Sequence, residues 1–353
     1  GDPCLDEHFT DRQPDRAFLA WVEAVKAAGV RRIAGDLVID ASAFAGPIRP
    51  ETYPDSEANV QQWFNAPASA LAFNDNCIEV RVLPTAPGEP AEVQVRPRSA
   101  RISVVNRTRT VTAVARPKLI ATRALAANTV TVSGDYDRPT DWFPMAIHRD
   151  PDLLAGDHLR ALLAEAGIPV SGEVRLAGVD PKAGPELHVC RNLLLPALAI
   201  LNQRSQNFYG EQILRVLGRE TGGAGSVADG AAAVFNALHA LGLGGDDWVI
   251  LDGSGLSYGN RASASALCRL LSLMQNHALG ADYLSTLKED RRLPRSLVKT
   301  GTLAIATCLA GYLDGPPGRR PCFAIVINRG EARSFDWAPA LRDDLLTALA
   351  RQP

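Results

Sequence analysis

The segment from Val82 to about Asp141 differs in pattern from the rest of the chain, and it determines how the chain divides into domains. Within this segment, alternating or β-branched stretches are separated by proline and glycine, which is typical of short strands joined by turns. The expected strands are Glu92–Arg96, Arg101–Val105, Thr110–Val114 and Thr129–Val132. Helical patterns precede and follow the segment, so the sequence predicts a small β-rich subdomain inserted into an α/β chain.

The flanking segments have helical periodicity. The apolar stripe Phe18, Trp21, Val22 and Val25 predicts an amphipathic helix that ends at Gly29, and a strand is expected at Arg32–Asp40. Further helices are expected at Leu194–Leu201, from Tyr209 to a stop at Gly218, after the N-cap residues Ser226 and Ser263, and at Leu341–Leu349. Two strands, Leu309–Leu313 and Phe323–Ile327, are expected to form a hairpin.

Length and charge exclude some classes of protein. A chain of 353 residues is long enough for two or three domains. A formal net charge of −2 gives no reason to expect nucleic acid as a partner. No apolar run approaches the ~18 residues that cross a bilayer. The first residues, Gly-Asp-Pro-Cys, have no signal-peptide pattern, which leaves the location open because a mature chain would look the same.

The cysteines and histidines predict neither a metal site nor a dense disulfide framework. The six cysteines contain no C-x-x-C pair, and no two of the six histidines stand at i, i+4. Cys308 and Cys322 are the closest pair in sequence, but the expected hairpin places Cys322 opposite Tyr312. Cys308 then lies several residues along the strand, beyond the ~7 Å Cα limit for a bridge. We expect six reduced, buried cysteines, with a disulfide as the alternative, and no cofactor.

Three short segments carry candidate chemistry: Ser205-Gln206-Asn207, Asp252–Ser257 (DGSGLS), and Lys299-Thr300-Gly301-Thr302. Each is weak alone, since a K-T-G triplet also suits the start of a strand with a tight turn. In this order, the motifs resemble those of serine penicillin-recognising enzymes. The variant here resembles the class C low-molecular-mass penicillin-binding proteins, which are D-Ala-D-Ala carboxypeptidase/endopeptidases. The similarity extends to GDPCL, GVRRIAGDLVID, NAPASALAFNDN, Ala310-Gly311-Tyr312 and the F-x-I-x-x-N segment that ends at Asn328.

The resemblance implies a fold and a set of domains. It implies an α/β fold whose residues 185–353 form part of a penicillin-binding transpeptidase or β-lactamase-like domain. Residues 1–83 and 143–184 would form an additional α/β domain, and residues 84–142 the inserted β-rich subdomain. Three positions depart from the family pattern: Tyr258 replaces an arginine, Ala304 stands where glycine or asparagine is usual, and Gly210 replaces an alanine.

The resemblance also implies roles for the site residues. Ser205 would relay a proton toward the leaving amine, and Asn207 would hold the amide of the substrate. Lys299 and Thr300 would bind the terminal carboxylate of D-Ala-D-Ala. Gly301 and Thr302 complete the substrate-binding strand, and the Thr302 N–H would form half of an oxyanion hole. We expect these residues to line one cleft, with Ser205 Oγ and Lys299 Nζ about 3–5 Å apart.

The family's nucleophile segment, S-x-x-K, has no counterpart at the expected place. The only S-x-x-K in this chain is Ser285–Lys288, which we expect to lie outside the cleft and not to supply the nucleophile. One hypothesis is a serine-type D-Ala-D-Ala carboxypeptidase/endopeptidase whose nucleophile lies outside this chain. The alternative is a catalytically inactive homologue that keeps a wall-peptide-binding cleft; a β-lactamase is less favoured because of the inserted region. The implied partners are peptidoglycan stem peptides and β-lactams, in the periplasm or another extracytoplasmic location. The oligomeric state stays open.

Overall fold

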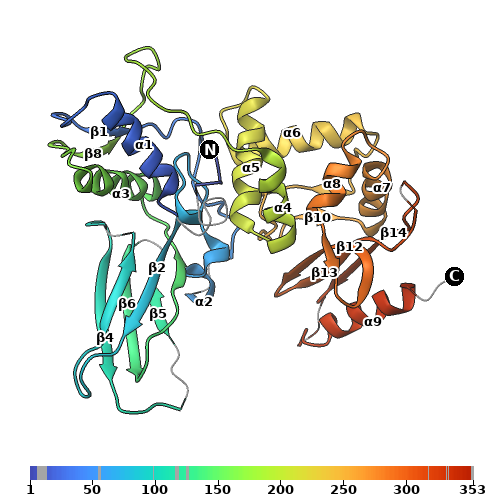
Figure 1. The fold of residues 1–353 in the computed structure, drawn as a ribbon. Coiled ribbons are helices and arrows are strands. Elements are labelled where there is room, and N and C mark those ends of the chain that lie inside the picture. Colours follow the sequence, from blue (N-terminus) through green and yellow to red (C-terminus); the bar gives the residue numbers. More distant parts are fainter. Residues whose placement is uncertain are drawn as a thin grey trace.

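The structure is a computed structural model that describes residues 1–5, 14–54, 57–97, 99–115, 119–124, 127–316, 318–330, 332 and 334–350. Figure 1 shows an N-terminal layer of helices and short strands, a β-rich subdomain beneath it, and a C-terminal part coloured yellow to red on the other side. Among the described residues, no helix combines the length and the apolar character needed to cross a membrane.

The N-terminal layer packs two helices on a short parallel strand pair. Its elements are α1 (Arg16–Ala27), β1 (Leu37–Ile39), α2 (Glu57–Val60), η1 (Trp63–Asn65), η2 (Asn74–Asn76), α3 (Pro151–Glu165) and β8 (Val174–Leu176). The predicted first helix is confirmed, and Phe18 and Val22 are its buried residues. The strand expected at Arg32–Asp40 is shorter than predicted, because its partner β8 offers three residues for pairing and only one further bridge joins Ile33 to Val170.

The β-rich subdomain contains two three-stranded sheets. The first has the order β3 (Glu92–Arg96), β2 (Cys77–Leu83), β7 (Phe143–Ala146), and the second β4 (Ser103–Thr110), β6 (Thr129–Tyr136), β5 (Ile120–Arg123). The strand expected at Arg101–Val105 begins at Ser103 and continues to Thr110, since β4 pairs in parallel with β6 along its whole length. The strand expected at Thr110–Val114 is wrong, because only Thr110 belongs to a strand. The first sheet crosses the expected boundaries at residues 83 and 143, so the insertion shares a sheet with the domain that contains it.

The C-terminal part packs helices on both faces of an antiparallel sheet. The sheet has the order β11 (Lys288–Asp290), β12 (Leu293–Leu303), β13 (Ala306–Tyr312), β14 (Cys322–Asn328), with a small pair β9 (Trp248–Val249) and β10 (Arg261–Ala262) beside it. Its helices are α4 (Leu194–Arg204), α5 (Asn207–Glu220), α6 (Val227–Ala240), α7 (Ala264–Met274), α8 (Gly280–Thr286) and α9 (Ala338–Ala350). Leu346 of α9 packs with Leu309 on one face, and Leu271 of α7 packs with Tyr312 on the other.

Several helix ends follow from local sequence. Ser226 forms a capping box with Asp229, and the Ser263 side chain accepts from the Ala266 N–H, so both predicted N-caps are confirmed. The stop predicted at Gly218 is wrong, because α5 continues to Glu220. Gly218 serves close packing instead, since a Cβ there would lie 2.5 Å from the backbone nitrogen of Gly230 in α6.

A large apolar surface remains exposed in the C-terminal part. Helix α4 buries only Ala197, and Leu193 and Leu194 beside it are 77% and 60% exposed. A cavity of about 950 Å³ opens between α6, α7 and the sheet, and Leu267 and Leu270 of α7 are among its apolar lining residues. Exposed apolar side chains and an open apolar cavity of this kind favour association.

We therefore expect the purified chain to bind a hydrophobic dye and to self-associate. The Leu193→Ser/Leu194→Ser variant should bind clearly less dye and sediment at a lower mass. Leu176→Ser is a matched control, because Leu176 is 48% exposed on β8, which belongs to the N-terminal layer and not to the C-terminal part. A monodisperse wild-type chain with a cooperative thermal transition and no dye binding would contradict the expectation.

Candidate active site

Ser205 occupies the turn between α4 and α5, in a strained backbone conformation. It caps the C-terminus of α4 with φ of 56° and ψ of 48°, in the left-handed region that non-glycine residues rarely adopt. Such conformations persist where the surrounding structure holds them, and they cluster at functional sites. The turn leaves the Ser205 side chain exposed at the helix junction.

Lys299 of β12 meets Ser205 across 94 residues of sequence. Its Nζ donates to Ser205 Oγ at 2.7 Å and to the carbonyl oxygen of Thr300 at 2.7 Å. The Ser205–Lys299 separation is slightly shorter than the expected range of about 3–5 Å, which confirms that the two motifs share one site. Lys299 is half-buried, and this burial lowers the pKa of its ammonium group.

The strand that carries Lys299 has an open edge. The main-chain hydrogen bonds at the two ends of the β13–β14 pair show that the odd-numbered residues of β13 direct their backbone N–H and C=O groups toward β14. The even-numbered residues of β13 therefore direct these groups toward β12, where they pair with Lys299 and Gly301. Thr300 and Thr302 consequently direct their N–H and C=O groups away from β13. In the described part of the chain, pairing on that side reaches only as far as Val298, so this edge is accessible to an extended peptide.

Gly301 leaves this position of the strand without a side chain. A Cβ at Gly301 would meet only the Cβ of Cys308, at 3.7 Å, which is an ordinary contact. The fold therefore has room for a side chain at this exposed position. A glycine here leaves space above the strand beside Lys299.

The segment after Ser205 is held by the N-terminal part of the chain. Asn207 begins α5, and its Nδ2 donates to the carbonyl oxygen of Phe64 at 3.0 Å. Gln206 is buried, and its Nε2 donates to the carboxylate of Asp75. The two contacts fix the turn at two successive residues. The expected role of Asn207 toward a substrate amide stays a prediction, since its NH₂ group already has one acceptor within the protein.

The D-G-S-G-L-S segment is a self-contained loop that packs against α5. The buried Asp252 carboxylate accepts from the N–H groups of Gly255 and Ser257, at 2.6 and 2.7 Å. Gly210 and Gly253 touch backbone to backbone, because a Cβ at Gly210 would lie 2.3 Å from the Gly253 carbonyl oxygen. This contact explains the departure at Gly210, where an alanine would displace the loop.

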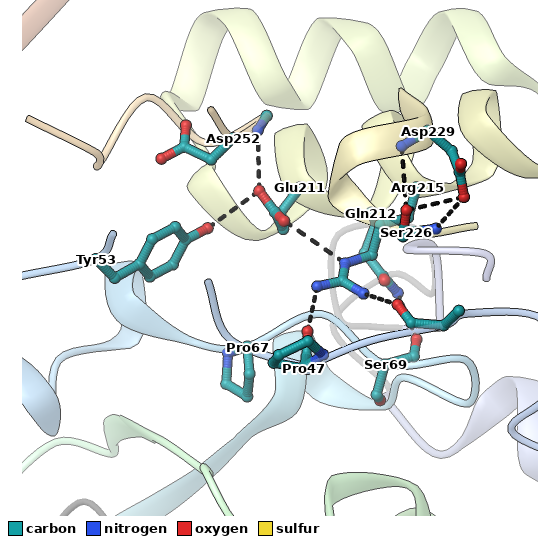
Figure 2. A network of polar contacts seen from close by, with 12 residues as sticks. Pro47, Tyr53, Pro67, Ser69, Glu211, Gln212, Arg215, Ser226, Asp229 and Asp252 are labelled. Carbon is teal, nitrogen blue, oxygen red and sulfur yellow. Dashed lines mark hydrogen bonds and ion pairs between the residues drawn. The ribbon is translucent and has the colours of Figure 1, made fainter. Parts of the chain in front are cut away.

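Figure 2 shows a polar network around Glu211 and Arg215 of α5 that sequence reasoning did not identify. Glu211 accepts from the Tyr53 hydroxyl at 3.2 Å and from the Gly253 N–H at 2.9 Å, and it forms an ion pair with Arg215 at 3.5 Å. Arg215 also donates to the carbonyl oxygens of Ala45 and Pro47. Burial raises the pKa of Glu211, and the nearby Arg215 opposes that rise. The sequence feature that could have indicated this network is a Glu–Arg pair at i, i+4 on a helix with a buried face.

The Ser285–Lys288 segment does not form a serine–lysine pair on one helical turn. Helix α8 ends at Thr286, and Lys288 already belongs to strand β11. The Ser285 hydroxyl donates to the carbonyl oxygen of Asp282 at 2.7 Å. Its backbone lies beside the end of α4, since Gln203 Nε2 donates to the Ser285 carbonyl at 3.2 Å. The expectation that Ser285 lies outside the cleft therefore stays a prediction.

Within the described ranges, no group of three His, Cys, Asp or Glu side chains could hold a metal ion. One of the six histidines, His8, lies outside those ranges.

Comparison with known proteins gives consistent matches. Residues 1–288 match the D-Ala-D-Ala carboxypeptidase 3 (S13) family. A D-alanyl-D-alanine carboxypeptidase of Actinomadura sp. (strain R39) is 30% identical over 93% of this chain. The chain spans 64% of the length of that curated relative.

Two solved structures resemble the fold. Penicillin-binding protein 4 (dacB) from Haemophilus influenzae has a TM-score of 0.74 at 21% identity, over 99% of this chain and 81% of that one. The same protein in complex with a β-lactam has a TM-score of 0.70 at 21% identity, over 96% and 78% of the two chains. These matches confirm the expected α/β penicillin-binding architecture.

Proposed function

The chain belongs to the D-Ala-D-Ala carboxypeptidase 3 (S13) family, and from this premise we propose that its cleft binds D-Ala-D-Ala-terminated stem peptides of peptidoglycan. The observation that carries the proposal is the contact between Lys299 Nζ and Ser205 Oγ at 2.7 Å, at the open edge of β12. An ammonium group and a hydroxyl from two separate motifs meet there beside outward-facing backbone groups. That combination suits a peptide that ends in a carboxylate.

The proposed binding mode places an extended peptide along β12. Its terminal carboxylate would contact Lys299 and the Thr300 hydroxyl, and its main chain would pair with the outward-facing groups of Thr300 and Thr302. The Thr302 N–H would donate a hydrogen bond to the attacked carbonyl oxygen and stabilise the negative charge that develops on it. Ser205 would pass a proton to the leaving amine, since its hydroxyl both accepts from Lys299 and can donate.

The proposed reaction is serine-type carboxypeptidase or endopeptidase hydrolysis through an acyl-enzyme, with the nucleophilic serine outside residues 1–353. The alternative is a catalytically inactive homologue that keeps the wall-peptide-binding cleft. Both place the chain in the periplasm or outside the membrane, where peptidoglycan lies, and both allow β-lactams as ligands. The Haemophilus protein, whose fold is similar, has been solved with a β-lactam bound.

Binding is tested by titrating the chain with a labelled peptide that ends in D-Ala-D-Ala, and with the same peptide amidated at its C-terminus. We expect Lys299→Met to weaken binding of the free acid roughly tenfold or more, because a charge-assisted hydrogen bond typically contributes that much to affinity. Binding of the amide should change little, because it lacks the carboxylate. Lys288→Met is the matched control, since Lys288 is an exposed lysine on the neighbouring strand. Equal losses for acid and amide would contradict the assignment of Lys299 to the carboxylate.

The same titration has an expected pH dependence. Only the protonated ammonium of Lys299 attracts a carboxylate, and burial lowers the pKa of this group below that of an ordinary lysine. Affinity for the free acid should therefore be full at low pH and fall as the pH rises through the lowered pKa. The amidated peptide should show no such fall. An affinity for the acid that stays constant until the range of an exposed lysine would contradict the expectation.

A further inference from the structure

Two cysteines far apart in sequence meet where α7 packs on the sheet. The Cys322 thiol, at the start of β14, donates to the carbonyl oxygen of Cys268 in α7 at 3.4 Å. The Ala324 N–H, two residues along β14, interacts with the Cys268 thiol. Cys268 therefore lies against β14 between Cys322 and Ala324, and its thiol is next to that of Cys322. Both residues are half-buried, so a small reagent can reach them.

From this geometry we propose that Cys268 and Cys322 are a dithiol site that oxidises to a disulfide joining α7 to β14. Cys308 and Cys322, the closest pair in sequence, do not meet, as the expected hairpin predicted, because Cys322 pairs with Tyr312 and Cys308 pairs with Val326. The spatial partner comes from a helix 54 residues earlier in the chain.

The surrounding contacts hold the two elements in place for such a bond. The Tyr312 hydroxyl donates to the carbonyl oxygen of Leu271 in α7 at 2.7 Å. Gln275, directly after α7, exchanges two hydrogen bonds with the backbone of Arg320, just before β14. The part of α7 that follows Cys268 is thus fixed to the sheet next to the start of β14. A disulfide tolerates only a narrow range of backbone separations, and elements fixed in this way can form one without a large rearrangement.

The chemistry is thiol–disulfide exchange with a small disulfide such as oxidised glutathione. One protein thiolate attacks the oxidant, forms a mixed disulfide and releases one reduced glutathione. The second protein thiolate then attacks the mixed disulfide and releases the other, so two protein thiols lose two protons and two electrons in total. Burial, followed by the neighbouring Cys322, raises the pKa of the Cys268 thiol. Its thiolate is therefore scarce at neutral pH, and the reaction should accelerate as the pH rises.

The bond would form in an oxidising compartment, which is where the proposed function places the chain. It would fix α7 to the sheet whose strand β12 carries Lys299, two strands away from β14. The chemical test below needs no peptidoglycan substrate, so its outcome does not depend on the proposed function.

The test is to incubate the native 353-residue chain with oxidised glutathione at pH 7 and pH 9, block the remaining thiols and map the peptides by mass spectrometry. We expect a peptide that links Cys268 to Cys322, formed faster at pH 9, with the other four cysteines blocked as thiols. Six blocked thiols after prolonged incubation at pH 9, or a disulfide between any other pair, would overturn the proposal.

Variants and heat give independent readouts. Cys308→Ser, which changes another half-buried cysteine on the same sheet, should leave the linked peptide unchanged, whereas Cys322→Ser should abolish it. The oxidised wild type should unfold about 5–10 °C above the same protein after reduction, since a disulfide that closes a loop of this size constrains the unfolded chain. This comparison uses the wild-type sequence alone, so it holds even where a variant folds poorly. Coincident transitions for the oxidised and reduced protein would count against a bond formed in the native geometry.

Discussion

Fluorescent penicillin should leave the 353-residue chain without a covalent label. Acylation needs a serine whose proton is taken by a neighbouring amine. The S-x-x-K segment of this chain does not provide that pair, because Ser285 lies in the last turn of α8 and donates to the carbonyl oxygen of Asp282, while Lys288 starts a strand. Loss of a catalytic serine costs on the order of 10⁶-fold in rate, or about 8 kcal/mol of barrier. The contacts of Lys299 and Thr300 with a carboxylate cannot supply that amount.

Three proteins make the comparison: the chain itself, its Ser285→Ala variant, and a version that includes any coding sequence upstream of Gly1. Labelling of the extended protein alone, with an S-x-x-K in the added segment, would support the peptidase. An extended protein that carries S-x-x-K and still resists the label would support the binding module. Labelling of the 353-residue chain that disappears in Ser285→Ala would show that this chain has its own nucleophile.

The parts of the fold that the sequence predicted are those governed by local chemistry. Ser226 and Ser263 cap their helices with their own side chains, and the β13–β14 hairpin places Cys322 opposite Tyr312 as the strand pattern indicates. The meeting of Ser205 and Lys299 was predicted from motif order, because the resemblance supplied the long-range pairing that local pattern lacks.

What could not be predicted depends on partners distant in sequence. Gly218 looks like a helix stop, yet it is a contact point for Gly230 of α6. The parallel pairing of β4 with β6 extends the strand expected at Arg101–Val105 to Thr110, and nothing local specifies a parallel partner. The Cys268–Cys322 contact arises for the same reason, since it depends on how α7 docks on the sheet.

The buried Glu211–Arg215 pair should be the most sensitive point for stability. Both side chains are almost fully buried, at 0% and 1% exposure, and they join α5 to the loop at Gly253 and to residues 45–53 of the N-terminal part. Arg215→Met removes the counter-charge of Glu211 and leaves the carbonyl oxygens of Ala45 and Pro47 without their donor. Breaking a buried pair from one side typically costs about 3–5 kcal/mol, which urea unfolding would measure as a lower midpoint. Arg219→Met, at an exposed arginine near the C-terminal end of the same helix, should stay within about 0.5 kcal/mol of wild type.

The loss of stability caused by Arg215→Met should depend on pH, and the pKa of Glu211 determines the direction of that dependence. Burial already raises this pKa in the folded chain, and removal of Arg215 raises it further because that guanidinium favours the charged carboxylate. A carboxyl group whose pKa is raised on folding binds its proton more tightly in the folded chain than in the unfolded chain. The stability of the variant should therefore fall as the pH rises from the pKa of Glu211 in the unfolded chain to its raised pKa in the folded chain. The deficit relative to wild type should therefore be largest near pH 7 and shrink toward pH 4–5, about the ordinary range of a glutamate. Glu211→Gln/Arg215→Met removes the charge that needs a partner, so it should recover part of the loss and show little of the pH dependence. A single variant whose deficit is the same at both pH values would mean that Arg215 stabilises the fold through its backbone contacts to residues 45 and 47 and not through Glu211.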